Sequence, residues 1–314
     1  MGDVPLSDHD YRVLALNIQG SFFERRCWKI IEEAPGWRLF ATNHPVSYQR
    51  AGSTLPPEES ALDIKAYLGQ QSSYLSSDKA LTLLIECKKN NPEFIEWVFF
   101  PSKPHSTYFP CIEVKSTQTN INDAEIRPYH LQVMHNLLVA DDGWETRGNY
   151  DEYRKLKDNK PKVDKGITRT AKKDISDAAY QIALATQSVV AEEADPDNCI
   201  RFNPTAETLV DMKLFVPAIV TTAQLLLCEF DPGDISVSTG EIPFDKVTFT
   251  QVPYLIYRYP LPRRLQSNFR FTTREAVMYG SPDVFLYMDI FVVNSEKLEN
   301  FLDSVPSMMS GFLK

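Results

Sequence analysis

Apolar positions in the first ninety residues follow first a helical and then a strand-like spacing. Apolar side chains recur every three or four positions over 21–34, which predicts an amphipathic helix that ends at Pro35-Gly36. Three strands are predicted after it, at 37–42, 61–68 and 80–85. The last of these is apolar apart from Thr82, as is typical of a central strand buried on both faces.

The same reasoning predicts a second helix over 174–194 and a buried strand at 214–220. The region 90–173 before them is less regular. Its predicted parts are strands at 97–100 and 111–115, a short helix at 128–140, and a polar loop over 141–173. After residue 222 the predicted elements are strands at 225–230, 254–259 and 284–293 and a closing helix at 295–302.

These elements predict an α/β fold class. The core, 1–222, has the order helix, three strands, helix, strand, and a long insertion at about 90–173 separates the third strand from the second helix. The remaining residues, 223–314, are expected to form a β-rich extension packed on the core.

Composition narrows the class of protein. The chain has 314 residues, of which 24% are charged, and no apolar run approaches the roughly 18 residues of a membrane span. The N-terminus lacks a basic region followed by an apolar stretch, so no secretory signal is expected. The five cysteines are widely scattered without a CxxC pair, which argues against a disulfide framework or a cysteine-rich zinc site. We therefore expect a cytoplasmic protein with no membrane association.

Charge is distributed unevenly along the chain. The formal net charge of −9 speaks against wrapping nucleic acid, but nine Lys or Arg and only two Asp lie between Arg154 and Lys173. This stretch either binds phosphates electrostatically or is a solvated linker. Its candidate nucleic-acid-binding residues are Lys155, Lys157, Lys160, Lys162, Lys165, Arg169, Lys172 and Lys173.

Candidate chemistry lies on two of the predicted strands. Asp63 falls within one strand, and Glu86-Cys87-Lys88 ends the most apolar strand of this half. Two carboxylates on neighbouring strands can share a hard divalent cation such as Mg²⁺, which prefers oxygen ligands. In a strand, the first and third side chains of a triplet point to the same face, so Glu86 and Lys88 can serve one site while Cys87 offers its backbone carbonyl.

This arrangement resembles the PD-(D/E)XK nuclease superfamily, with restriction-endonuclease-like folds, and is nearest to its Holliday-junction resolvase and Mrr-like branches. The residues that carry the resemblance are Gly20 to Arg26 with Gly36-Trp37, Leu62-Asp63-Ile64 and Leu84 to Lys88. The resemblance implies a Mg²⁺- or Mn²⁺-dependent endonuclease acting on DNA, with RNA not excluded. Asp63 and Glu86 would bind the metal, Cys87 would add its carbonyl, Lys88 would assist the attacking water, and Glu24 would be an outer-shell acid. A homodimer or a partner protein is also consistent with it.

Alternatives remain at each position. Glu24 is spaced three residues after Ser21, so the two can form a capping box at the start of the helix instead. Glu113-Val114-Lys115 is a rival triplet that also ends a short apolar run. The alternative function is a catalytically inactive nuclease-fold protein that binds nucleic acid or protein within a defence or repair assembly, and a chance triplet in an unrelated α/β protein is the third reading.

Overall fold

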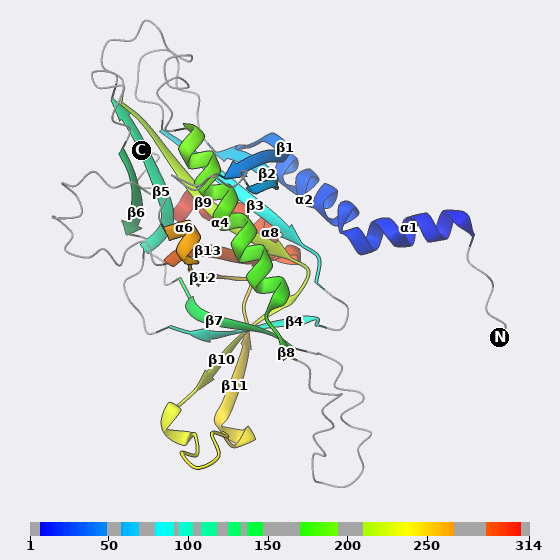
Figure 1. Cartoon of the computed structure of the whole chain (residues 1–314), viewed down its shortest axis with the longest axis vertical. Helices are drawn as coiled ribbons and strands as arrows, with labels where there is room; N and C mark the ends of the chain where they lie inside the picture. Colours follow the sequence, from blue (N-terminus) through cyan, green and yellow to red (C-terminus); the bar gives the residue numbers. More distant parts are fainter. Residues whose placement is uncertain are drawn as a thin grey trace, which may run out of the picture.

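A computed structural model describes residues 7–48, 58–68, 79–90, 94–102, 108–117, 125–132, 137–146, 170–193, 210–266 and 287–308 (Figure 1). Its helices are α1 (Asp8–Gln19), α2 (Ser21–Glu33), α4 (Lys173–Glu193), α6 (Arg263–Gln266) and α8 (Leu298–Met308), with short 3₁₀ turns at Pro232–Asp234, Phe244–Lys246 and Ser295–Lys297. Its strands are β1 (Trp37–Tyr48), β2 (Glu58–Leu68), β3 (Lys79–Lys88), β4 (Glu96–Pro101), β5 (Tyr108–Thr117), β6 (Glu125–Gln132), β7 (Val139–Thr146), β8 (Thr170–Ala171), β9 (Val210–Thr221), β10 (Gln224–Phe230), β11 (Val247–Gln251), β12 (Tyr254–Pro260) and β13 (Tyr287–Asn294).

The strands form one mixed sheet with the order β1-β2-β3-β9-β13-β12-β7-β4-β10-β11. At one end β1, β2 and β3 pair antiparallel in succession, and β3 then pairs parallel with β9. The long strand β9 also pairs with β5 along its first half and with β13 along its last residues. Strands from the insertion and from the C-terminal region therefore continue the sheet that begins with β1 to β3.

Two apolar cores cover the two faces of this sheet. On one face the buried side of α4 packs over the sheet, with Ile182, Leu184 and Val189 fully enclosed. On the other face α2 and α8 cover β3, β9 and β13, with Ile31 and Phe301 at the centre of that cluster. A strand enclosed between two such layers must be apolar on both sides, which is the pattern that 80–85 shows.

The mixed α/β class predicted from the sequence is confirmed. Most of the predicted strands lie within observed strands, namely those at 37–42, 61–68, 80–85, 97–100, 111–115, 214–220, 225–230 and 254–259. The helix predicted at 174–194 is α4, the predicted closing helix continues to Met308, and β13 matches the predicted strand at 284–293 from Tyr287 onward. None of the helices that the structure describes is both long and apolar enough to cross a membrane.

Two predictions for the insertion are wrong. The short helix predicted at 128–140 is replaced by the end of β6 and the start of β7, because residues 125–132 find a partner strand in β5. The loop predicted over 141–173 begins too early, since β7 runs to Thr146 and pairs antiparallel with β4. Residues 147–169 of that predicted loop lie outside the described residues.

The capping box predicted at Ser21 and Glu24 is also wrong. Gly20, with φ of +83°, lies between α1 and α2 and serves as the C-cap of the first and the N-cap of the second. This left-handed conformation favours glycine. Ser21 is already inside α2, so its hydroxyl does not cap the helix, and the capping box is found instead at Ser7 and Asp10 of α1.

Candidate active site

Asp63 lies where β2 and β3 stop pairing. The ladder between them ends at Ile64 opposite Ile85, and Oδ2 of Asp63 accepts a hydrogen bond of 2.7 Å from the backbone N–H of Cys87. The regular alternation of β2 breaks at the same point. Leu62 belongs to the core beneath α4, whereas Ile64 belongs to the core beneath α2, although residues two apart in a regular strand share a face. Asp63 therefore occupies an irregularity in the strand, and its carboxylate is tied to the end of β3.

The alternation of side chains along β3 places Cys87 on one face of the sheet and Glu86 and Lys88 on the other. Cys87 packs in the core beneath α2, where its thiol meets that of Cys27. Glu86 and Lys88 follow Leu84, which belongs to the α4 side, so their side chains share that face. The predicted direction of the three side chains is thus the one observed, and Glu86 is 8% exposed.

The ammonium group of Lys88 reaches the first turn of α4. Its Nζ lies 3.6 Å from Oδ1 of Asp174. The backbone N–H groups of Asp174 and Ile175 both donate to Oε1 of Glu145, at 2.6 and 3.2 Å. Glu145, from β7, is 1% exposed and satisfies amides that the helix cannot pair internally. Strand β7 thus fixes the start of α4, and α4 in turn fixes the position of Lys88.

Glu24 approaches the same place from the other layer. It lies in the first turn of α2, whose preceding residue Gly20 is against Lys89 at the end of β3. Its charge contributes to raising the pKa of both Asp63 and Glu86, and burial raises the pKa of Glu24 itself. The structure therefore brings together the four predicted residues Glu24, Asp63, Glu86 and Lys88.

The pKa values of the two central carboxyl groups, Asp63 and Glu86, are both raised. Burial raises the pKa of Asp63 to about 6, although the Cys87 N–H and Lys88 act against that rise. Burial raises the pKa of Glu86 to about 9, with the charge of Asp63 as the second cause. Because each carboxylate disfavours ionisation of the other, the pair binds a proton more readily than either carboxyl group would alone, and a bound cation would oppose this.

The donor set fits a hard cation held by few protein ligands. Among the described residues, no three His, Cys, Asp or Glu side chains are grouped closely enough to hold a metal ion. Mg²⁺, however, is usually bound by one or two carboxylates, with water and substrate phosphate completing its octahedral shell. Asp63 and Glu86 supply that number of carboxylates, and their mutual repulsion is the kind of strain that a divalent cation relieves.

The basic residues predicted to contact nucleic acid are only partly described. Lys155, Lys157, Lys160, Lys162, Lys165 and Arg169 lie outside the described residues. Lys172 forms an ion pair with Asp142, and its Nζ lies 4.1 Å from the centroid of the Trp144 ring. Lys173 is exposed at the start of α4. The rival triplet at Glu113 is in the middle of β5, which pairs on both sides, rather than at a strand end.

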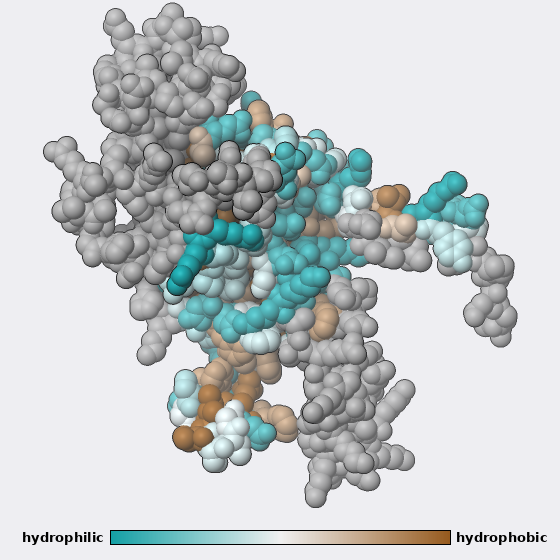
Figure 2. Space-filling view, in the orientation of Figure 1, coloured by the Kyte–Doolittle hydropathy of each residue, from teal (hydrophilic) through white to brown (hydrophobic). Residues whose placement is uncertain are grey.

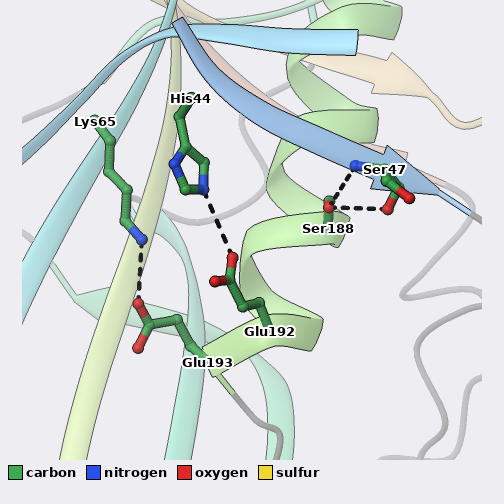
Figure 3. A network of polar contacts seen from close by, with 6 residues as sticks. All are labelled: His44, Ser47, Lys65, Ser188, Glu192 and Glu193. Atoms are coloured by element: carbon green, nitrogen blue, oxygen red, sulfur yellow. Dashed lines mark hydrogen bonds and ion pairs between the residues drawn. The ribbon is translucent and has the colours of Figure 1, made fainter. Parts of the chain in front are cut away.

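A second polar cluster lies at the opposite end of α4 (Figure 3). Glu193 accepts hydrogen bonds from Nζ of Lys65 at 3.1 Å and Nζ of Lys213 at 2.7 Å. His44 and Glu192 approach to 3.6 Å beside it, and the Ser188 hydroxyl exchanges hydrogen bonds with the backbone of Ser47. None of these contacts was expected from the sequence, because the partners are separated by up to 141 residues.

Asp174 and Glu145 are the site residues that the sequence argument missed. Asp174 is recognisable only as an acid in the first turn of a helix, which is a common feature. Glu145 fell in a region predicted to be a loop, so nothing marked it as buried. Comparison with known proteins provides no independent assignment, since no protein-family model, no curated protein and no solved structure matches the chain.

Proposed function

We propose that this chain is a metal-dependent nuclease that hydrolyses phosphodiester bonds of DNA. The observation that carries the proposal is the convergence of Asp63, Glu86 and Lys88 where β2 and β3 part, with Glu86 buried, Asp63 partly buried and the pKa of both carboxyl groups raised. Perturbed titratable groups that converge on one place are a mark of functional sites. A purely structural role would leave two repelling carboxylates with Lys88 as their shared cation, and Lys88 is also paired with Asp174.

The order of elements supports the same proposal. Helix α2, strands β1 to β3, helix α4 and strand β9 follow the order that the PD-(D/E)XK resemblance implies, and the strands are adjacent as β1-β2-β3-β9. The two helices cover opposite faces. On this basis we propose a restriction-endonuclease-like core to which the insertion and the C-terminal strands have been added.

Each residue has a distinct role in the proposed reaction. Asp63 and Glu86 would hold Mg²⁺ or Mn²⁺ together with the Cys87 carbonyl. The bound ion would supply an acidified water and neutralise charge on the attacked phosphate. Lys88 donates hydrogen bonds to the attacking water or to the phosphate oxygens, and Asp174 keeps its ammonium group directed at the site. Glu24, in the first turn of α2, would be an outer-shell acid of the metal site.

A cleavage assay on plasmid and on short single-stranded, double-stranded and branched DNA tests this proposal. With Mg²⁺ or Mn²⁺ present, Asp63→Asn and Lys88→Ala are each expected to lower the cleavage rate at least about 100-fold, the usual loss for a group that stabilises the transition state. Lys89→Ala is the matched control, because the adjacent Lys89 instead donates to the backbone carbonyl of Asn17. It should retain the wild-type rate.

Binding of Mn²⁺, measured by calorimetry on the whole chain, separates the alternatives. Metal-dependent cleavage that survives in Asp63→Asn would contradict the assignment of the site. Absence of both cleavage and Mn²⁺ binding in the wild type would favour the inactive binding protein. RNA oligonucleotides in the same assay decide whether the substrate is DNA alone.

A further inference from the structure

Strands β10 and β11 form an arm that projects from one end of the sheet (Figure 1). They pair antiparallel from Phe230 opposite Val247 to Leu226 opposite Gln251, and residues 231–246 connect them at the free end. β11 is the last strand in the sheet order, and no other described strand pairs with it. Its outer edge therefore presents unpaired backbone groups.

This edge lacks the features that normally protect a free strand. The sequence of β11 is Val-Thr-Phe-Thr-Gln, without a charge or a proline, and its last four residues are all exposed. Its ladder with β10 is regular, with no bulge that would twist the edge away. Natural edge strands are usually blunted by lysine, proline or a bulge, because an open edge is a template for another strand.

The backbone groups that face outward can be identified. The N–H of Val252 donates to the carbonyl of Leu225 on β10, so alternation turns the N–H and C=O of Phe249 and Gln251 away from β10. The side chain of Phe249 is 55% exposed. Phe249 is thus the central residue of β11. On the open edge it offers one backbone N–H donor and one C=O acceptor to a further strand.

The arm also combines apolar surface with negative charge. Val237 and Phe244, near its free end, are almost completely exposed, and apolar colour gathers there in the space-filling view (Figure 2). Exposed apolar surface of this kind marks a contact with protein. The stretch 229–246 holds five acidic residues and one lysine, which disfavours nucleic acid as the partner.

We propose that β11 pairs antiparallel with β11 of a second copy of this chain, in a two-fold symmetric dimer. Pairing centred on Phe249 sets Thr248 opposite the second copy's Thr250 and Val247 opposite its Gln251, so no like charges face each other. The antiparallel arrangement also directs the two acidic arm ends in opposite directions. The strand is complementary to itself, and the dimer extends the sheet through both chains.

Sedimentation of the whole chain, at concentrations up to about 100 μM because a small interface binds weakly, tests the dimer. Two double variants place like charges across the pair: Thr248→Lys with Thr250→Lys, and Thr248→Glu with Thr250→Glu. Each alone should be monomeric, with a dissociation constant raised at least about tenfold, and an equimolar mixture of the two should form a heterodimer. Ser238→Lys, on the same arm but outside β11, is the control and should dimerise as the wild type does.

A cysteine variant tests the register independently of charge. Residues directly opposite in a hydrogen-bonded antiparallel pair have Cα atoms about 5.5 Å apart, which a disulfide can span. Cys228 on β10 lies opposite Phe249 within the same chain, so it is first replaced by alanine. Phe249→Cys in the Cys228→Ala background should then give a covalent dimer with copper phenanthroline as the oxidant, and Cys228→Ala alone, treated in the same way, is the control. A wild type that remains monomeric throughout, or a dimer that persists in both charge variants while Phe249→Cys gives no covalent dimer, would overturn the proposal. Equal circular dichroism spectra exclude misfolding as the reason for a monomer.

Discussion

The carboxyl groups at the two ends of α4 have pKa values shifted in opposite directions. At its C-terminal end, Glu193 pairs with the ammonium group of Lys65, whose side chain is only 3% exposed (Figure 3). It also pairs with the ammonium group of Lys213. Burial acts to raise the pKa of Glu193, but Lys213 and Lys65 outweigh it and the pKa is lowered. At its N-terminal end, the buried Glu86 and the partly buried Asp63 lie beside one lysine, which is also paired with Asp174, and their pKa values are raised.

Under the proposed function, this difference separates a structural cluster from the proposed metal site. The negative end of a helix dipole disfavours a carboxylate. The ammonium groups of Lys65 and Lys213 offset this effect and the burial of Glu193, so the chain itself stabilises the charged form. The carboxyl pair near Lys88 is not neutralised by the chain itself. The effects of burial and mutual repulsion on the two pKa values exceed the opposing effect of the one shared ammonium group. Neutralisation there must come from outside the chain, as a proton or a metal ion.

Removing Glu193 should have the largest effect on stability. Glu193→Ala would leave Lys65 buried without its partner, and breaking a buried ion pair costs about 3 kcal/mol or more. Urea unfolding of the whole chain measures this loss. Glu192→Gln is the matched control, because Glu192 is exposed and its contact with His44 should contribute under about 0.5 kcal/mol. Equal losses in the two variants would contradict a structural role for the cluster.

Substitution at the other end should change stability in the opposite direction. Glu86→Gln is expected to stabilise the metal-free protein by about 1–2 kcal/mol, because an amide needs neither a buried charge beside Asp63 nor the uptake of a proton that removes this charge on folding. Added Mg²⁺ should then raise the unfolding temperature of the wild type but not that of the variant. Thermal unfolding with and without the metal measures both effects. A variant less stable than the wild type without metal would show that Glu86 is a structural residue.

A smaller loss is expected where α4 holds β1. The Ser188 hydroxyl accepts from the Ser47 N–H at 3.2 Å and donates to its carbonyl at 3.0 Å. Ser188→Ala should lower the free energy of unfolding by about 0.5–1 kcal/mol, the usual contribution of such bonds. Ser188→Thr keeps the hydroxyl and should recover most of the loss in the same urea titration. No loss in the alanine variant would mean that water replaces these bonds without cost.

The smallest expected effect is a change in acid sensitivity. Because the pKa of Glu193 is lower in the folded chain than its unfolded value, its stabilising contribution is present above that unfolded value and is lost as the pH falls through the folded one. Glu193→Gln should therefore lose less stability than the wild type as the pH falls below about 5, the start of carboxylate protonation in unfolded chains. Urea unfolding at a series of pH values measures the two slopes, and parallel slopes would contradict the lowered pKa.

The most reliable predictions came from segments whose neighbours do not alter the local pattern. The apolar run 80–85 is typical of a buried strand, the apolar stripe of 174–194 is typical of an amphipathic helix, and both are observed. The segment 128–140 was misread because its apolar residues fit a helix locally, while β5 offered a distant strand partner. The capping box with Ser21 was open as an alternative for Glu24 because nothing local revealed that a helix precedes Gly20 and places Ser21 inside α2.

The sequence by itself determined the α/β class, the central strand and the choice of Asp63, Glu86 and Lys88, because burial patterns and charged interruptions are local properties. Only the tertiary structure decided that Asp63 lies at an irregularity bonded to Cys87, that Asp174 and Glu145 support Lys88, and that Glu193 is neutralised by two lysines. These contacts join residues far apart in the chain. Their energies depend on burial and on distances between charges, and neither exists until the layers have packed.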